Sequence, residues 1–478
     1  MESEQTQISE KMGKASGDYV KPIEGGMQST QDLEIKIYKK RWLMLVLFVL
    51  YSASNSMQWV QYSVITNIVM RYYNVSSFLI DMTSMIFMIT YIPLIFPASY
   101  LLDKFGLRYA VIFGALGNAL GSWIKVFSIA TDRFWITFLG QTVVAVSQIF
   151  VLSVPARLAA VWFGPDQVSS ACSIGIFGNQ LGIAIGFLFP PMLVPNSDDI
   201  CNIEKGLRLM FYIVAGLTML VLVLILFFFK SAPPLPPSLA QVMQKENKKW
   251  DIFGNETFSR SIKRLFTNIG FIFLLVSYGI NMGVFSAIST LLNQVILKYF
   301  PGHEEDVGRI GLTMTCIGVL NCVISGVILD KTHKFKETTL VVCLCDFIGM
   351  IIFTVTLDSK GIYVIYITTS ILSFFISGYL SVAFEFAAEL TYPEPEGTAA
   401  GLLNAAMEVF SFIFTMLYSF LFGKWGDLWA NIAMCIGLGI GILLAFIIPN
   451  DLRRQNAKEQ QKRTAETFVT SNVTISDE

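Results

Sequence analysis

The sequence predicts an all-α membrane protein of twelve transmembrane helices, arranged as two six-helix bundles. Three observations support this fold class. Hydrophobic residues make up 54% of the 478 residues and charged residues only 14%, which leaves too little polar surface for a soluble protein of this size. Twelve segments hold the ~20 mostly apolar residues that a helix needs to cross a bilayer. The two halves of the chain also share motifs at a nearly constant spacing.

The predicted spans form two groups of six, separated by one long connection. Their expected bounds are 42–69, 78–101, 107–128, 134–162, 168–192, 208–229, 269–297, 309–329, 338–357, 361–391, 397–422 and 428–449. The connection opens with prolines and continues with charged residues, which is typical of a linker. The predicted domains are a polar N-terminal tail (1–41), an N-terminal bundle (42–229), this linker (230–268), a C-terminal bundle (269–449) and a polar C-terminal tail (450–478).

Two pairs of motifs indicate that the second bundle repeats the first. The segment 101–104, Leu-Leu-Asp-Lys, recurs 227 positions later as Ile-Leu-Asp-Lys at 328–331. The small residues that open the fifth span at 168 have a counterpart at 397, an offset of 229. Transporters built from parallel repeats bind their substrate between the repeats, near the middle of the bilayer. We therefore expect the functional site on the axis between the bundles.

Basic residues indicate the orientation. If both termini are cytoplasmic, the tails and loops on that side hold 24 of the 34 Lys and Arg residues. This bias favours cytoplasmic termini, linker and tails. The glycosylation sequon at Asn74 then lies in the first outside loop. The first 40 residues contain no apolar run, so we expect no cleavable signal peptide.

Composition excludes several functions. A formal net charge of -1 provides no basic field, so we expect no nucleic-acid partner. Six of the seven cysteines lie in apolar stretches, which does not fit a disulfide framework. His303 and His333 both lie in predicted loops, so the membrane interior offers no histidine ligand. With no nucleotide-binding loop or nucleophile motif, we expect no enzyme, no cofactor and no metal site.

Charged residues between the second and third spans predict a gate. Asp103 and Arg108 resemble the major facilitator signature Gly-x-Leu-x-Asp-Arg-x-Gly-Arg-Arg, although Ser99 stands at its first glycine. Asp330 holds the corresponding position in the second half. Such charges can lock the ends of neighbouring helices and separate when a carrier changes conformation. A short turn with solvated charges is the alternative.

Polar residues also occur inside the first predicted span. Asn55, Trp59 and Tyr62 are spaced so that one helix face presents all three. Polar groups at this depth are costly unless they meet partners or a water-filled cavity. Trp59 lies away from the interfacial aromatic belt, and its ring face can bind a cation or simply pack against neighbours.

Further polar residues lie in other spans. Gln148, Asn293 and Glu408 are expected in the fourth, seventh and eleventh spans, and carboxylates inside a bundle are functional candidates. Glu389 lies nearer the cytoplasmic end of the tenth span. We expect it to pair with Arg157 of the fourth span, as a structural or gating contact.

Several unusual strings resemble the feline leukaemia virus subgroup C receptor family of major facilitators. They lie at 58–63, 91–98, 161–165, 178–182, 190–196, 289–294 and 389–394, and the similarity runs from about 40 to 449. The resemblance implies a major facilitator fold and facilitative transport of choline, with ethanolamine also carried and haem transport attributed to some members. It also implies the plasma membrane or an internal membrane, such as that of the mitochondrion or endoplasmic reticulum. We predict a plasma-membrane protein that is monomeric.

The resemblance also implies a site. Trp59 and Gln148 match the family's tryptophan in the first span and glutamine in the fourth. The family's tyrosine in the seventh span aligns with Ser286, and its glutamine in the eleventh aligns with Glu408. These departures exchange ring surface for a negative charge, which leaves open a primary ammonium substrate or a proton acceptor at Glu408. The predicted substrate-binding residues are Trp59, Gln148, Phe285, Ser286, Asn293, Glu408, Asn55 and Tyr62.

The sequence thus predicts an alternating-access carrier of choline or a related small organic cation such as ethanolamine. Its partners are this small-molecule substrate and the lipid bilayer. In this hypothesis Trp59 binds the cation, Glu408 balances its charge and Gln148 contacts its hydroxyl. Two alternatives are a proton-coupled carrier of another metabolite and a haem exporter, which the absence of an intramembrane histidine disfavours. A receptor or scaffold that transports nothing would not need these polar residues inside the membrane.

Overall fold

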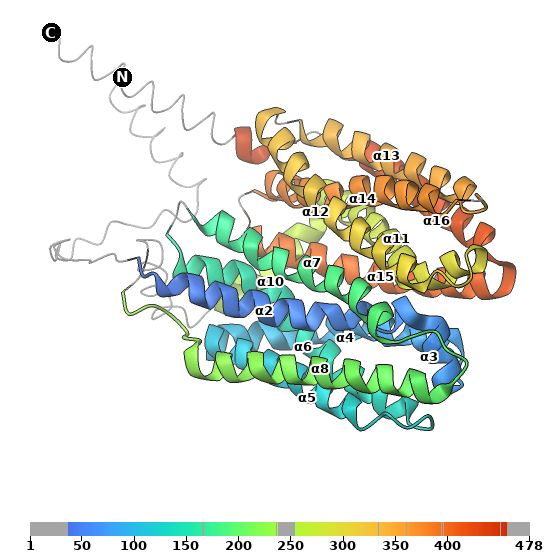
Figure 1. Ribbon diagram of the computed structural model, residues 1–478. Helices are drawn as coiled ribbons and strands as arrows, with labels where there is room; N and C mark the ends of the chain where they lie inside the picture. The colour runs from blue at the N-terminus through green and yellow to red at the C-terminus, as the bar shows by residue number, and fades with distance from the viewer. Residues whose placement is uncertain are drawn as a thin grey trace, which may run out of the picture.

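A computed structural model describes residues 37–164, 167–235, 237, 254–332, 334–359, 361–392, 394, 396–449 and 451–456. In these residues every regular element is a helix, and twelve segments are long and apolar enough to cross a membrane. The predicted fold class is therefore confirmed. The helices run side by side in one elongated bundle (Figure 1). The first span begins and the last one ends at the same end of the bundle, which we call the terminal end; the opposite end is the far end.

The first six spans pack mainly with one another. Their helices are α2 (Lys40–Val60) with η1 (Ser63–Ile65) and α3 (Thr66–Tyr73), α4 (Ser77–Phe105), α5 (Leu107–Val126), α6 (Phe134–Trp162), α7 (Val168–Leu193) and α8 (Ile200–Phe228). The most extensive contacts in this half join α5 to α6 and α2 to α7. We call this set of helices the N half.

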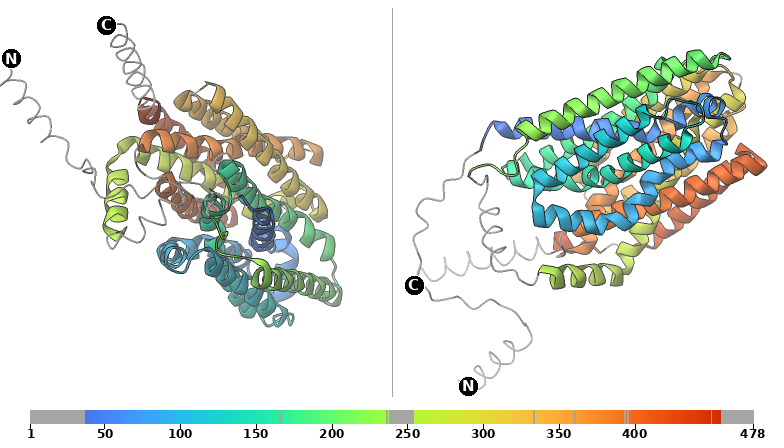
Figure 2. Two further views of the ribbon diagram at one scale, coloured as in Figure 1. Left: turned by 90° about the vertical axis from the view of Figure 1, so that its left-hand side faces the viewer. Right: turned by 90° about the horizontal axis from the view of Figure 1, so that it is seen from below.

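The remaining six spans form the C half. Their helices are α11 (Ile269–Tyr299), α12 (Glu304–Thr332), α13 (Phe335–Thr356), α14 (Ile362–Thr391), α15 (Glu396–Trp425) and α16 (Asp427–Ile447). Within this half α11 packs along α15, and α12 along α14. Between the halves, the short helix α10 (Gly254–Thr267) lies outside the bundle at the terminal end (Figure 2).

The halves meet along two main helix pairs. In one, α7 packs against α12, and in the other α4 packs against α15. Glycines bring α7 unusually close to α2 on its other side. A Cβ atom would lie 2.4 Å from the Ala53 carbonyl oxygen at Gly182, and 2.5 Å from the Met57 carbonyl oxygen at Gly186. Larger residues at these two positions would therefore push α2 away from α7.

The first span is broken, whereas the sequence analysis expected a continuous helix over 42–69. Helix α2 ends at Val60, and α3 begins only at Thr66. Hydroxyl side chains compete for the backbone here: Ser63 Oγ donates to the Val60 carbonyl at 3.1 Å, and Thr66 Oγ1 donates to the Ser63 carbonyl at 2.8 Å. A break inside a membrane protein frees carbonyl groups that must find other partners.

Candidate substrate site between the two halves

Side chains from neighbouring helices hold the carbonyl groups at the break. Gln141 of α6 donates from Nε2 to the Gln58 carbonyl at 2.6 Å. Ser84 of α4 donates from Oγ to the Trp59 carbonyl at 2.8 Å. These contacts fix the backbone on which the Trp59 ring is carried. Broken membrane helices frequently form the binding sites of carriers for this reason, since they combine a rigid backbone with accessible polar groups.

The Trp59 side chain lies in the interior of the bundle. It is half-buried and packs against a small cluster formed by Phe87 of α4 with Val144 and Ala145 of α6. Part of the ring therefore remains accessible while the rest is held by packing. A tryptophan ring held in this way can bind a cation on its accessible face.

Gln148 provides a polar atom that has no partner. It lies on α6, one turn after Ala145, and its side chain is half-buried. The Oε1 atom itself is buried, and no residue that the structure describes donates a hydrogen bond to it. A buried amide oxygen without a donor is unfavourable by about 1–3 kcal/mol. A hydroxyl or ammonium group of a ligand would satisfy it.

Glu408 is a buried carboxylate of the C half. It lies on α15, is only 5% exposed, and has no hydrogen bond or ion pair with any residue in the described ranges. It is close enough to interact electrostatically with Tyr91 of α4, in the N half, and with Tyr278 of α11, in the C half. An unpaired buried carboxylate is costly, so either a proton or a bound cation is needed to stabilise it.

Tyr91 and Tyr278 were not among the predicted site residues. Both are almost completely buried, and the Tyr278 ring lies 6.0 Å from the rings of Tyr379 and Phe384. Tyr91 stands at the start of one of the strings that resemble the transporter family, and this was the one available signal. The two tyrosines bring one aromatic ring from each half toward Glu408.

Ser286 lies beside α15, on the face that carries Glu408. Ser286 is 7% exposed, and its Oγ lies 2.8 Å from Oγ of Ser411, one turn after Glu408. Phe285 is half-buried and packs against the large hydrophobic cluster that spans both halves. The structure therefore brings Ser286 close to the predicted carboxylate.

Asn55 and Tyr62 do not share an accessible face with Trp59, contrary to the expectation from their spacing. Asn55 is fully buried and donates from Nδ2 to Asn118 Oδ1 at 3.2 Å and to Ser147 Oγ at 3.0 Å. Tyr62 is also fully buried, with its ring 6.3 Å from that of Phe211 of α8. Both side chains face the interior of the N half, so we leave them out of the proposed substrate site.

Asn293 joins the two halves at the far end instead of lining the site. Its Nδ2 donates to the Val64 carbonyl at 2.8 Å and to Asn67 Oδ1 at 3.3 Å. Asn67 in turn donates to Glu304 Oε1 at 3.2 Å, and Asn196 donates to the same oxygen at 2.5 Å. These contacts connect η1, α3 and the α7–α8 connection of the N half with α11 and α12 of the C half.

A buried carboxylate of α4 adds two hydrogen bonds between the halves at the far end. Asp81 of α4 is fully buried and accepts hydrogen bonds from Gln294 Nε2 at 2.7 Å and Ser419 Oγ at 2.6 Å. Both donors belong to the C half. We call the whole set the far-end latch: Val64, Asn67, Asp81, Asn196, Asn293, Gln294, Glu304 and Ser419. It closes the far end of the bundle with uncharged donors and carboxylate or amide acceptors.

The predicted gate at the terminal end is only partly described. The side chains of Asp103 and Asp330 lie outside the described residues. Arg108 is exposed and donates to the Leu226 carbonyl of α8 at 3.2 Å.

Glu389 is 5% exposed, and its Oε2 accepts a hydrogen bond from the backbone N–H of Gln455 at 3.2 Å. Gln455 belongs to the segment that follows α16, so this segment contacts the end of α14. The expected ion pair between Glu389 and Arg157 stays a prediction.

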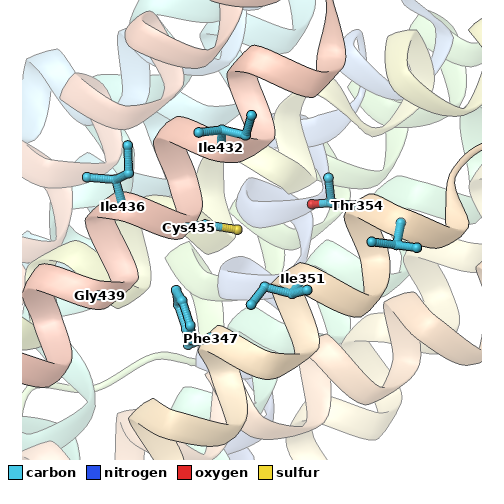
Figure 3. Close-up of a pocket in the computed structure, with 8 residues that line it drawn as sticks. Phe347, Ile351, Thr354, Ile432, Cys435, Ile436 and Gly439 are labelled. Carbon is cyan, nitrogen blue, oxygen red and sulfur yellow. The ribbon is translucent and has the colours of Figure 1, made fainter.

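Two surface hollows lie away from this region. One, of about 450 Å³, is an apolar groove between α13 and α16, and Figure 3 shows Phe347 and Ile351 facing Ile432 and Cys435 across it. The other, of about 410 Å³, lies at the far end between the end of α7 and the start of α8. Neither is lined by a predicted site residue. The groove lies on a surface of large exposed hydrophobic side chains, which is a surface for lipid.

Known proteins match the chain over most of its length. A sequence model of the Major Facilitator Superfamily matches residues 44–415. The Danio rerio choline/ethanolamine transporter flvcr2b is 49% identical over 92% of this chain and 89% of its own. The Homo sapiens choline/ethanolamine transporter FLVCR2 is 45% identical over 89% of this chain and 80% of its own.

Solved structures agree with the fold. A bacterial homologue of the human lysosomal transporter Spinster, in an inward-facing and occupied conformation, has a TM-score of 0.68 and 13% identity, covering 87% of this chain and 98% of its own. A D-xylose–proton symporter also has a TM-score of 0.68 and 13% identity, over 86% of this chain and 97% of its own. At this identity the likeness concerns the helical architecture alone.

Proposed function

Because the chain belongs to the major facilitator superfamily and, within it, to the family of the FLVCR choline/ethanolamine transporters, we propose that it carries choline and ethanolamine across a membrane. The two halves open a shared site to one side of the membrane at a time. Trp59 binds the ammonium group through its ring face, Gln148 contacts the hydroxyl group, and Glu408 balances the positive charge.

The observation that carries this proposal is the unpaired carboxylate of Glu408. It is 5% exposed, lacks a described hydrogen bond or ion pair, and has a tyrosine from each half within electrostatic range. A small organic cation supplies the missing charge without requiring any protein group to move away. The buried Oε1 of Gln148 supports an alcohol as the second functional group, since it lacks a donor among the described residues.

The same residues can accept both substrates by different contacts. The quaternary nitrogen of choline has no N–H group, so ring faces and a general negative charge bind it. The primary ammonium of ethanolamine has three N–H groups, which can donate directly to the Glu408 carboxylate. We therefore expect choline to depend more on Trp59, and ethanolamine more on Glu408.

The direction of opening follows from the distribution of charge. The bias of basic residues supports a cytoplasmic terminal end, which makes the far end the outside. With the far-end latch formed, the site is closed to the outside. We propose a monomeric carrier in the plasma membrane with both termini cytoplasmic, in which substrate from outside enters only after the latch opens.

Uptake of labelled choline into liposomes that contain the purified protein tests the proposal. Trp59→Ala should reduce uptake at low substrate concentration about tenfold, the effect of losing about 1.4 kcal/mol of cation–π binding. Trp135→Ala is the matched control, because Trp135 is 65% exposed on the outer surface of the bundle. Equal uptake by the wild type and the Trp59→Ala protein would contradict the assignment of Trp59.

Glu408→Gln tests the counter-charge. We expect ethanolamine uptake to fall more than choline uptake, because the primary ammonium loses a charged hydrogen-bond acceptor. Uptake should not require a pH gradient in either protein. If wild-type uptake instead followed an imposed pH gradient, and Glu408→Gln abolished that response, the carrier would be proton-coupled and our assignment of Glu408 to the substrate would fail.

A further inference from the structure

Lys125 is an ionisable side chain in the interior of the N half that the substrate site does not use. It lies near the end of α5 and is 1% exposed. No carboxylate in the described part of the chain lies within ion-pair distance of it. A lysine inside a membrane bundle is costly and needs a reason to be there. Its contacts supply one.

The Lys125 ammonium group binds two amide side chains. Nζ lies 2.5 Å from Gln58 Oε1 and 3.0 Å from Gln141 Oε1. The Tyr62 ring lies on a third side, with its centroid 5.7 Å from Nζ. All of these partners are uncharged. The lysine thus joins α2, α6 and the break in the first span from a third helix, α5.

These contacts determine how the two amides are turned. A lysine ammonium group only donates hydrogen bonds, so it must face the oxygen and not the nitrogen of each amide. The nitrogen of each amide then points the other way. Gln141 Nε2 donates to the Gln58 backbone carbonyl at 2.6 Å, and Gln58 Nε2 donates to Asn118 Oδ1 at 2.9 Å. The Gln141 amide donates to the Gln58 carbonyl on one side and accepts from the lysine on the other, so both contacts select the same orientation of this amide.

The Gln58 carbonyl is the group that connects Lys125 to the site. It is one of the carbonyls at the break after α2, and the next residue in the chain is Trp59. We propose that Lys125 is a positioning residue for transport: through Gln141 it holds the Gln58 carbonyl, and thereby the orientation of the Trp59 ring. This inference rests on the proposed function, because it concerns the residue to which we assign ammonium binding.

A double-mutant cycle tests the proposal on the full-length protein in liposomes. Lys125→Met keeps a similar length but donates no hydrogen bond, so the KM for choline should rise about tenfold, as expected when a buried hydrogen bond worth about 1.4 kcal/mol is lost. The KM for ethanolamine should rise less. In the Trp59→Ala background, Lys125→Met should cause no further rise. Lys205→Met, at an exposed lysine of α8, is the matched control.

Gln141→Glu separates positioning from stability. Glutamate keeps an acceptor for Lys125 and forms an ion pair with it, but it donates nothing to the Gln58 carbonyl. We expect the same rise in choline KM as for Lys125→Met, without a fall in melting temperature. This variant also keeps the test available if Lys125→Met fails to fold.

Three results would overturn the proposal: an unchanged choline KM in Gln141→Glu, an equal rise for both substrates, or additive effects of the Lys125 and Trp59 substitutions. A loss of Vmax alone would assign Lys125 a purely structural role. Failure of the proposed function looks different, since the wild-type protein itself would then take up neither choline nor ethanolamine.

Discussion

The two halves differ in how they pair the buried polar side chain at one repeat-related position. In the N half, Asn118 of α5 donates from Nδ2 to Ser54 Oγ at 3.0 Å, and its Oδ1 accepts from Asn55 at 3.2 Å and from Gln58 at 2.9 Å. In the C half, Asp346 of α13 stands 228 positions after Asn118, an offset between those of the two repeated motifs. It is fully buried, and neither carboxyl oxygen has a hydrogen-bond partner among the described residues.

The neighbours of Asp346 follow the same trend. Asn281 of α11 donates only a long contact, 3.7 Å, to Cys343 Sγ, and its Oδ1 has no described partner. The Thr339 hydroxyl, two turns before Asp346 on the same helix, also has none. Around Asp346 the C half therefore keeps buried polar atoms without a described partner, whereas the repeat-related Asn118 of the N half is paired.

The difference coincides with the break in the first span. The seventh span, its counterpart in the repeat, is one continuous helix, Ile269–Tyr299, whose carbonyls are satisfied within the helix. The first span has free carbonyls at its break, and the amides of the N half are turned to hold them. A duplicated architecture can therefore retain its helix packing while one half uses side chains of neighbouring helices to hold the carbonyls of an irregular helix.

The largest effect is expected from removing the centre of the N-half network. Asn118→Leu removes the acceptor that Asn55 and Gln58 share and the donor to Ser54, three buried hydrogen bonds in all, so the free energy of unfolding should fall by about 3 kcal/mol. Chemical denaturation in detergent measures it. Asn281→Leu in the C half is the matched control and should cost about 1 kcal/mol or less, because Asn281 makes only one weak contact. Equal losses would remove the contrast between the halves.

Breaking the far-end latch should have the next largest effect. In Asp81→Ala, Gln294 and Ser419 lose their acceptor, so the equilibrium should shift by about 2 kcal/mol toward a far end that is open. Spin labels at Asn74 and Asp358, exposed at the far ends of the two halves, report this opening as a longer distance. The exposed cysteines Cys201 and Cys316 need replacement first.

An unchanged distance distribution in Asp81→Ala would contradict a role of the latch in closing the far end. Thr313→Ala serves as the control, because the Thr313 hydroxyl donates only to the carbonyl one turn earlier in its own helix.

A smaller effect of opposite sign is expected at Asp346. Asp346→Asn introduces the amide that the N half carries and removes an unpaired buried acid, so the free energy of unfolding should rise by about 1 kcal/mol. The melting temperature in detergent measures this. A marked loss of stability would show that the Asp346 carboxyl group makes a stabilising contact that asparagine cannot replace.

The smallest effects are expected at the exposed ion pairs that each half carries. Arg208 and Glu204 in α8 lie 2.5 Å apart, and Arg309 and Glu305 in α12 lie 2.8 Å apart. Glu204→Ala and Glu305→Ala should each change the free energy of unfolding by no more than about 0.5 kcal/mol. If one substitution lowered the free energy of unfolding clearly more than the other, the two halves would also differ in how strongly surface ion pairs stabilise them.

The fold followed from the sequence because long apolar segments leave few alternatives to membrane helices. The break after Val60 did not, since the stretch remains apolar on both sides and the groups that hold it, such as Gln141 and Ser84, are distant in sequence. Hydrophobic patterning detects which segments cross the membrane. It does not detect which carbonyls are captured by a side chain from another helix.

The sequence predicts a site residue where a residue type is rare inside a membrane span. Glu408 was found in this way, because a carboxylate within a span is rare. Asn55 was expected in the space between the halves, but its side chain lies in the core of the N half. Helical spacing alone does not distinguish these two places. Tyr91 was missed because a tyrosine in an apolar span has the same pattern as a packing residue.

The close contact at Gly182 and Gly186 has a mechanical consequence. With no side chain between them, α7 and α2 are held backbone to backbone, while α7 also packs along α12 of the other half. The helix that carries Trp59 therefore reaches α12 through α7, whereas η1, which follows it, contacts α11 directly. We expect a movement of α12 to shift α7 and α2 together. A larger residue at Gly182 or Gly186 would separate α7 from α2, so it should reduce the transport rate even though the binding residues are unchanged.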